Sequence, residues 1–287
     1  MKSICTFLLV CLLSTTLEAA KKVYPLTNEP IDVVLVTHPK DKEALELSIE
    51  GIRTYGENIG RVIVVSSEPL SDQAEWFDEK LYPFSKADMS LEIGRGDQKV
   101  ADEFFARRGH PVGWYYQQML KLYAAYVIPN ISSNILVLDS DSVFVNPVSF
   151  LDEKGGGLLC INTKKGTKGH YCRHAARMLP SYNRVYPEYN SVNHHMLLQK
   201  PILDDLFEEI EQARSEPLWK VFCHEVDIGR KFGSGSEYEL YYNFALNHTD
   251  QVQIREIKRR ASSSFDKMDF YQDSGYQLIS FHSYMRK

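Results

Sequence analysis

The chain has 287 residues, and its 33 lysines and arginines against 38 aspartates and glutamates give a formal net charge of −5. Hydrophobic residues make up 44% and charged residues 25%, which is ordinary for a globular protein and excludes a disordered, collagen-like or polytopic membrane chain. Because there is no basic excess, we expect no nucleic acid among its partners. The length is sufficient to bury a sizeable core without disulfide bonds.

The first twenty residues have the pattern of a secretory signal peptide. Lys2 precedes a mostly apolar run from Ile4 to Leu13, and small residues end the segment at Ala19 and Ala20. This run is too short to cross a bilayer, so the alternative is a short anchor that is not removed. We therefore predict a signal peptide (or short anchor) over residues 1–20 and one domain over 21–287, without a transmembrane span beyond such an anchor. The predicted location is the secretory pathway: the ER or Golgi lumen in a eukaryote, and the periplasm or the exterior in a bacterium.

Three cysteines, Cys160, Cys172 and Cys223, lie beyond the predicted leader. In an oxidising compartment one pair could form a disulfide and leave the third thiol free. The sequence leaves the pairing open.

The first half of the chain has a strand–helix–strand pattern. Residues 31–37 are a short apolar run typical of a strand buried on both faces, residues 40–55 have a helical pattern, and residues 61–66 are a second buried strand. This order and spacing predict a βαβ unit, and so a parallel sheet with a right-handed crossover.

The pattern of alternating elements continues to the end of the chain. We predict helices at 98–108, 114–127, 201–214 and from near Glu237, strands or extended segments at 135–138, 143–145, 158–161, 196–198 and 278–281, and a loop-rich stretch at 162–191. No internal repeat or linker divides the sequence, so the prediction is a single α/β domain.

Asp139 and Asp141 follow the predicted strand 135–138 directly. Ligands of open α/β sheets bind at the carboxyl ends of the strands, and alternation directs both carboxylates to one side if the backbone stays extended. Two convergent carboxylates suit Mn²⁺ or Mg²⁺, which would stabilise a diphosphate leaving group. The alternative is that Asp139 caps a turn and Asp141 is solvated; the position after a buried strand favours the metal and phosphate site.

Residues 33–37, 114–122 and 136–141 resemble glycosyltransferases of the GT-A fold. They are similar in particular to a family of small uncharacterised glycosyltransferase-like proteins, whose pattern has four motifs. All four are present: Gly-Trp-Tyr-x-Gln-Gln at 113–118, Asp-x-Asp at 139–141, a His-rich strand at 193–195 and Ser-Glu-Tyr-Glu at 236–239. The resemblance covers most of residues 21–287 and implies a GT-A-like (Rossmann-like) domain with a mainly parallel central sheet flanked by helices.

The resemblance also implies roles for Lys121 and His282. In glycogenin-like enzymes a lysine on the helix before the Asp-x-Asp strand reaches the nucleotide sugar, which would let Lys121 offset the charge of the diphosphate. The alternative is a lysine that extends to solvent from the edge of the helix. In many retaining GT-A enzymes a C-terminal histidine is the third protein ligand to the metal, which makes His282 the candidate here unless it is an ordinary surface histidine. A neutral imidazole suits Mn²⁺ better than Mg²⁺.

Two further groups of residues have a catalytic and a structural interpretation. Glu237 or Glu239 could act as general base on an acceptor hydroxyl, or Ser236 could cap a helix whose N-terminus both glutamates favour. Of His194 and His195, at most one faces the site if the chain is extended there.

Together these patterns predict a metal-dependent glycosyltransferase that moves a sugar from a nucleoside diphosphate donor to a glycan, lipid or protein acceptor. The predicted metal ligands for Mn²⁺ (or Mg²⁺) are Asp139, Asp141 and His282, the donor-binding residues are Thr37, His38, Gln118, Lys121 and Asp139, and the catalytic residues are Glu237 and Glu239. The alternatives are a nucleotidyltransferase or nucleotide-sugar hydrolase on the same fold, or a non-catalytic carbohydrate-binding protein. A bacterial periplasm is not expected to contain nucleotide sugars, whereas the ER and Golgi import them. The predicted signal peptide therefore does not decide whether the donor is a nucleotide sugar.

Overall fold

A computed structural model describes residues 21–107, 111–161, 169–230 and 235–285. The predicted signal peptide, residues 1–20, lies outside the described residues. None of the described helices combines the length and the apolar character that a membrane span requires.

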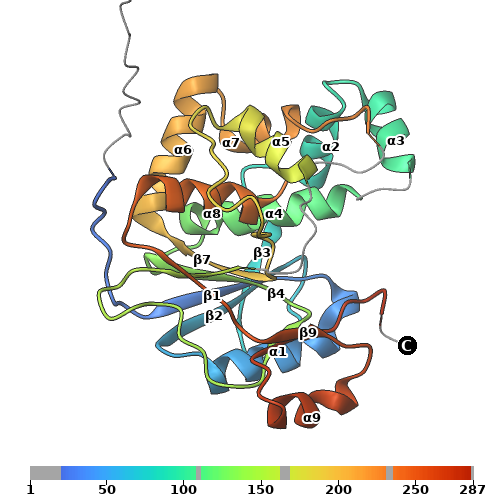
Figure 1. The fold of residues 1–287 in the computed structure, drawn as a ribbon. Coiled ribbons are helices and arrows are strands. Elements are labelled where there is room, and N and C mark those ends of the chain that lie inside the picture. The colour runs from blue at the N-terminus through green and yellow to red at the C-terminus, as the bar shows by residue number, and fades with distance from the viewer. Residues whose placement is uncertain (1–20, 108–110, 162–168, 231–234, 286–287) are drawn as a thin grey trace, which may run out of the picture.

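A five-stranded sheet forms the centre of the molecule (Figure 1), and its strand order is β3-β2-β1-β4-β7. The strands are β1 (Ile31–Val36), β2 (Ile59–Ser66), β3 (Glu75–Asp78), β4 (Asn134–Asp139) and β7 (His195–Gln199). The first four are parallel, and β7 pairs antiparallel with β4. The prediction of a mainly parallel α/β sheet is therefore confirmed.

Helices cover both faces of this sheet (Figure 1). Helix α1 (Lys42–Tyr55) lies on one face, and α4 (Val112–Val127), α6 (Lys200–Arg214) and α8 (Glu237–His248) lie on the other. The other helical segments are α2 (Lys86–Ile93), α3 (Gln98–Ala106), α5 (Gly169–Met178), α7 (Leu218–His224), α9 (Met268–Asp273) and the 3-10 turns η1 (Pro39–Asp41), η2 (Glu79–Leu81) and η3 (Phe265–Lys267).

The core is divided between the two faces by the alternation of side chains along each strand. Val34 and Val36 of β1 contribute to the cluster under α4, α6 and α8, whereas Leu35 packs with Leu45 and Ile49 of α1. The strands β1 and β4 thus bury both faces, which explains their continuous apolar runs in the sequence.

Two small sheets flank the central one. In the first, β10 (Leu278–Ser280) pairs with both β5 (Ser142–Phe144) and β9 (Arg259–Ala261); in the second, β6 (Leu158–Cys160) pairs with β8 (Gln253–Arg255). Because β5 follows β4 after one turn, the first small sheet brings the end of the chain beside the carboxyl end of β4.

The stretch 162–191, predicted to be loop-rich, contains helix α5, so that prediction is wrong for residues 169–178. The sequence of α5, GHYCRHAARM, is polar, but it places Tyr171, His174, Ala175 and Met178 on one buried face. The spacing of these four residues is helical, and tertiary packing of that face stabilises the helix.

Candidate active site

The carboxyl ends of β1 and β4 border a cavity of about 480 Å³ that Asp139 and Asp141 both line. We call it the inner cavity. The outer cavity, of about 650 Å³, adjoins it, because both are lined by Val36, Asp41, Trp114, Gln117, Ser140 and Tyr284. The chain passes from β1 to β2 on one side of β1, and later enters β4 on the other side. The cavities therefore lie at the point where an open α/β sheet binds its ligands.

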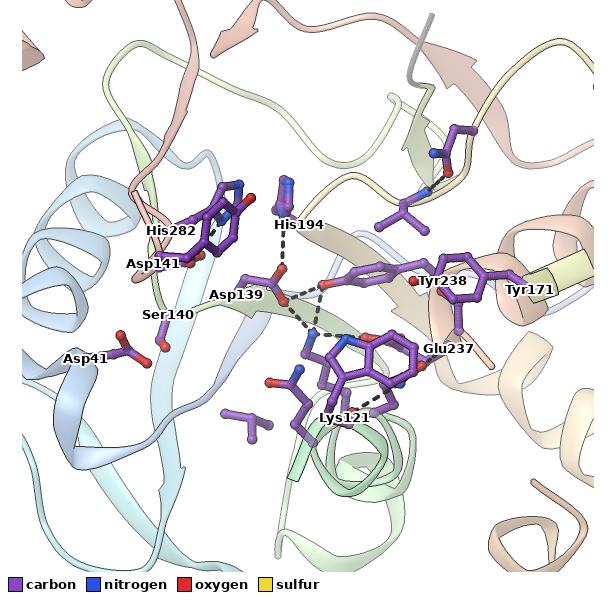
Figure 2. A pocket seen from close by; sticks show the side chains of 18 residues that line it. Asp41, Lys121, Asp139, Ser140, Asp141, Tyr171, His194, Glu237, Tyr238 and His282 are labelled. Atoms are coloured by element: carbon purple, nitrogen blue, oxygen red, sulfur yellow. Dashed lines mark hydrogen bonds and ion pairs between the residues drawn. The ribbon is translucent and has the colours of Figure 1, made fainter. Parts of the chain in front are cut away.

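A buried lysine lies in the wall of the inner cavity (Figure 2). The Nζ atom of Lys121, on α4, contacts Asp139 Oδ1 and donates to Glu237 Oε1 at 2.9 Å and to the Tyr238 hydroxyl at 3.1 Å. The side chain of Lys121 is only 3% exposed. The alternative that Lys121 extends to solvent is therefore excluded.

The charges of this group shift one another's pKa values. Burial alone would lower the pKa of Lys121, but the carboxylates of Asp139 and Glu237 raise it well above its usual value. Burial also acts on Asp139, but Lys121 and His194 hold the pKa of that carboxyl well below its ordinary range. For Glu237 the effect of burial prevails, and with the nearby Asp139 charge it raises the pKa above the usual value.

The N-terminus of α8 brings Glu237 and Tyr238 to this lysine. Ser236 caps the helix, since its side chain accepts from the backbone N–H of Glu239 at 3.3 Å, as one sequence interpretation required. Gln118 of α4 accepts from the backbone N–H of Glu237 at 3.1 Å. Gln118 lines the inner cavity, but its carbonyl oxygen holds α8 in place.

His194 and His195 point into different parts of the molecule. His194 lines the inner cavity, and its Nδ1 atom lies 2.9 Å from Asp139 Oδ2 (Figure 2). His195 is buried against the rings of Phe144 and Phe150. The prediction that at most one of them faces the site is confirmed, although the backbone at His194 is not extended.

Asp141 pairs with His282 rather than with Asp139. The backbone turns at residues 140–141, and Asp141 Oδ2 lies 3.1 Å from His282 Nδ1. The His282 ring stacks on Tyr284, with ring centroids 5.2 Å apart. Among the described residues, no three His, Cys, Asp or Glu side chains are arranged to hold a metal ion. Asp139, Asp141 and His282 all line the inner cavity, but only the last two converge.

Thr37 and His38 line the outer cavity, where β1 ends. The Thr37 hydroxyl is buried and has no hydrogen-bond partner within the described part of the chain. An unsatisfied buried hydroxyl is energetically unfavourable.

Glu239 does not line either cavity. Its carboxylate accepts hydrogen bonds from Ser191, from Tyr182 at 2.7 Å and from Asn243 at 2.9 Å, in the interior behind α8. Residues two apart on a helix do not share a face, so Glu237 and Glu239 cannot both point into one cavity. Of the two predicted catalytic glutamates, the structure brings only Glu237 to the site.

The three cysteines are free thiols in this structure. Cys160 and Cys223 are buried, and the Cys172 thiol lies 3.3 Å from Glu239 Oε1. No disulfide joins any two of them.

Sequence reasoning assigned no role at the site to Tyr238, Tyr171 or Tyr284, yet all three line the inner cavity. Tyr171 stacks on Trp114 with ring centroids 5.8 Å apart. Their positions in the sequence could have indicated a role at the site, because Tyr238 lies within the Ser-Glu-Tyr-Glu motif and Tyr284 is two residues from His282.

A comparison with curated proteins finds no match. Among solved structures, the apo form of mouse xyloside xylosyltransferase 1 is similar over 90% of this chain and 99% of that chain, with 12% sequence identity and a TM-score of 0.41. The model of a family of unknown function, DUF6492, matches residues 31–284. The chain described here therefore belongs to the DUF6492 family.

Proposed function

We propose that this protein is a glycosyltransferase that takes a sugar from a nucleoside diphosphate donor. The observation that carries the proposal is the pair of adjoining cavities at the carboxyl ends of β1 and β4, with Lys121 and two aspartates in the inner one. Their volumes of about 480 and 650 Å³ lie in the range of small-molecule sites.

The two cavities differ in the chemistry of their walls. The outer cavity has the aromatic residues Trp114 and Tyr116 in its wall, together with Thr37 at the end of β1, and these suit a nucleoside. The inner cavity has the charged groups of Lys121, Asp139 and Glu237, which suit a sugar and its diphosphate bond. A donor extending from one to the other would place its scissile bond beside Lys121.

A divalent cation fits the donor set of Asp141 and His282. One carboxylate and one imidazole converge there, and the remaining positions of a Mn²⁺ or Mg²⁺ ion are often filled by substrate phosphates and water. The cation would neutralise charge on the diphosphate leaving group. Both oxygens of Asp139 already have partners in Lys121, Tyr238 and His194, so we assign Asp139 to the organisation of the site.

In the proposed reaction, the bond between the sugar's anomeric carbon and the diphosphate oxygen breaks, and a bond forms between that carbon and an acceptor oxygen. The acceptor hydroxyl loses its proton to the Glu237 carboxylate, whose raised pKa suits a general base. In this proposal the ammonium group of Lys121 stabilises the charge that develops on the leaving diphosphate.

The test is release of nucleoside diphosphate by the purified protein, supplied with UDP- and GDP-sugars and Mn²⁺, with and without a chelator. We expect turnover with at least one donor, and loss of turnover on chelation. Release of sugar 1-phosphate, with the nucleoside monophosphate transferred to the acceptor, would instead indicate a nucleotidyltransferase. Diphosphate release with only free sugar formed in the presence of acceptors would indicate a hydrolase. Glycan binding that needs neither nucleotide nor metal, without turnover, would favour a carbohydrate-binding protein.

Asp141→Asn tests the cation site within this assay. We expect it to abolish metal-dependent turnover while the protein stays folded, because the amide keeps the shape of the side chain but is a weak ligand. Asp250→Asn is the matched control, since the Asp250 side chain is 83% exposed and lines neither cavity. Full turnover in Asp141→Asn would contradict the proposed cation site.

A further inference from the structure

His194 has a backbone conformation that a residue with a side chain rarely adopts. Its φ angle is 65°, in the left-handed region, where glycine and asparagine are favoured. The other described non-glycine residues with positive φ are Asn58, Arg95, Asn130 and Ser215, and none of these lines the inner or the outer cavity. An unfavourable conformation that persists in a cavity wall points to a function.

The conformation lets His194 hold Asp139 through both its main chain and its side chain. The backbone N–H of Asp139 donates to the carbonyl oxygen of His194 at 2.8 Å, and the His194 ring nitrogen Nδ1 lies 2.9 Å from Asp139 Oδ2. Because an ionised carboxylate only accepts hydrogen bonds, Nδ1 is the donor. Both neighbours of His194 are fixed, since Asn193 and His195 are buried and hydrogen-bonded.

The same imidazole also contacts the group that we assign to the cation. Its ring centroid lies 4.9 Å from that of His282, whose Nδ1 pairs with Asp141 (Figure 2). His194 therefore touches both halves of the inner cavity: the Asp139 and Lys121 pair on one side and the Asp141 and His282 pair on the other.

We propose that His194 is a positioning residue that fixes the Asp139 carboxylate, and through it the ammonium group of Lys121, for the transfer step. The inference deepens the proposed function and depends on it. The left-handed backbone is the means by which the chain turns this ring into the cavity while His195 enters the core.

The test compares His194→Gly with His194→Asn. Glycine adopts the left-handed conformation without steric strain but lacks the ring. Asparagine also tolerates that conformation and keeps an N–H donor at the place of Nδ1. We expect kcat of the glycine variant to fall 10- to 100-fold, as for outer-shell partners of catalytic groups, with a donor KM changed less than about threefold. The asparagine variant should recover most of the wild-type kcat, a rescue that a merely structural role would not produce.

Ser215→Gly provides the matched control for the backbone. Ser215 ends α6 with a φ of 55°, away from both cavities, so glycine should relieve the same conformation without changing kcat. Crystal structures of the two His194 variants give a readout independent of activity: the Asp139 carboxylate should leave its position in the glycine variant and keep it in the asparagine variant.

The outcomes separate the two proposals. Wild-type kcat in His194→Gly, or an unmoved Asp139 in its structure, would overturn the role of His194 and leave the glycosyltransferase proposal intact. If no donor binds to or reacts with the wild-type protein, the proposed function fails, and the position of Asp139 in the two variant structures still decides whether His194 fixes it.

Discussion

Lys121 balances the charge of two carboxylates that would otherwise repel each other in the protein interior. Its ammonium group contacts Asp139 and Glu237, and the side chains of Lys121 and Glu237 are 3% and 4% exposed. Removal of one partner from a buried ion pair leaves an uncompensated charge, which costs far more than an exposed pair contributes.

Lys121→Met should therefore lower the free energy of unfolding by about 3–5 kcal/mol, in addition to abolishing donor turnover. Glu237→Gln is the matched variant: it keeps the shape of the side chain and leaves the pair of Lys121 and Asp139, so its loss of stability should be clearly smaller. Urea unfolding of both variants at neutral pH measures the difference. Equal stability of Lys121→Met and wild type would contradict the charge balance inferred here.

At the scale of elements, helix α1 fixes the turn that carries Asp141 although it contributes no ligand. The Ser48 hydroxyl donates to the carbonyl oxygen of Ser142, next to Asp141. One turn along the helix, Gly51 lies so close to Phe144 of β5 that an added Cβ would collide with its carbonyl oxygen. The close approach of α1 to β5 is possible only because residue 51 lacks a side chain.

Gly51→Ala should destabilise the protein by about 1–3 kcal/mol, because the helix or β5 must move to make room. Gly113→Ala is the control: an added Cβ there meets no described atom within 4 Å, and alanine in helix α4 should raise stability by up to about 1 kcal/mol. Thermal unfolding of the two variants should therefore shift in opposite directions. A Gly51→Ala variant as stable as Gly113→Ala would show that α1 and β5 tolerate the extra volume.

The elements that the sequence predicts well are those that satisfy their own local pattern. The strands β1, β2 and β4 are buried on both faces and appear as apolar runs, and α1 and α6 have clear amphipathic spacing. Short strands such as β8 and β9 have little apolar character, since pairing partners distant in sequence hold them in place. Such partners are not visible in a local pattern.

The residues of the site likewise fall into those that a local sequence pattern identifies and those that it does not. The position of Asp139 after a buried strand identified it from sequence, whereas the partnership of Lys121 with Glu237 joins residues 116 positions apart. Glu239 has the same chemistry as Glu237 and lies in the same motif, but its place on the other side of α8 gives it a structural role. A motif gives residue types, and only the orientation of α8 separates the two glutamates.

At the scale of the whole molecule, His174 and His195 are buried in the interior, where the neutral form of the imidazole is favoured. Burial lowers the pKa of His174 and of His195 to about 3 from an ordinary value of 6.5. Between these pH values the unfolded chain binds a proton at each histidine and the native protein does not, so stability rises with pH. Below about pH 6.5, each buried histidine should lower the free energy of unfolding by about 1.4 kcal/mol for every unit by which the pH falls.

Urea unfolding between about pH 5 and 6 should show this slope, and His195→Gln should reduce it by about 1.4 kcal/mol per pH unit relative to wild type. A slope that is the same in His195→Gln and in the wild-type protein would contradict the neutral state of His195.

The two aspartates of the site are held by different sheets. Asp139 is the last residue of β4 in the central sheet, whereas Asp141 accepts a backbone hydrogen bond from Phe281, at the end of β10 in the small sheet. The distance between the two carboxylates therefore depends on how these sheets are seated against each other. A ligand that contacts both aspartates ties the sheets together, and part of its binding energy stiffens the junction. Amide hydrogen exchange in β5 and β10 is then a measure of ligand occupancy, even though neither strand contributes a side chain to the cavities.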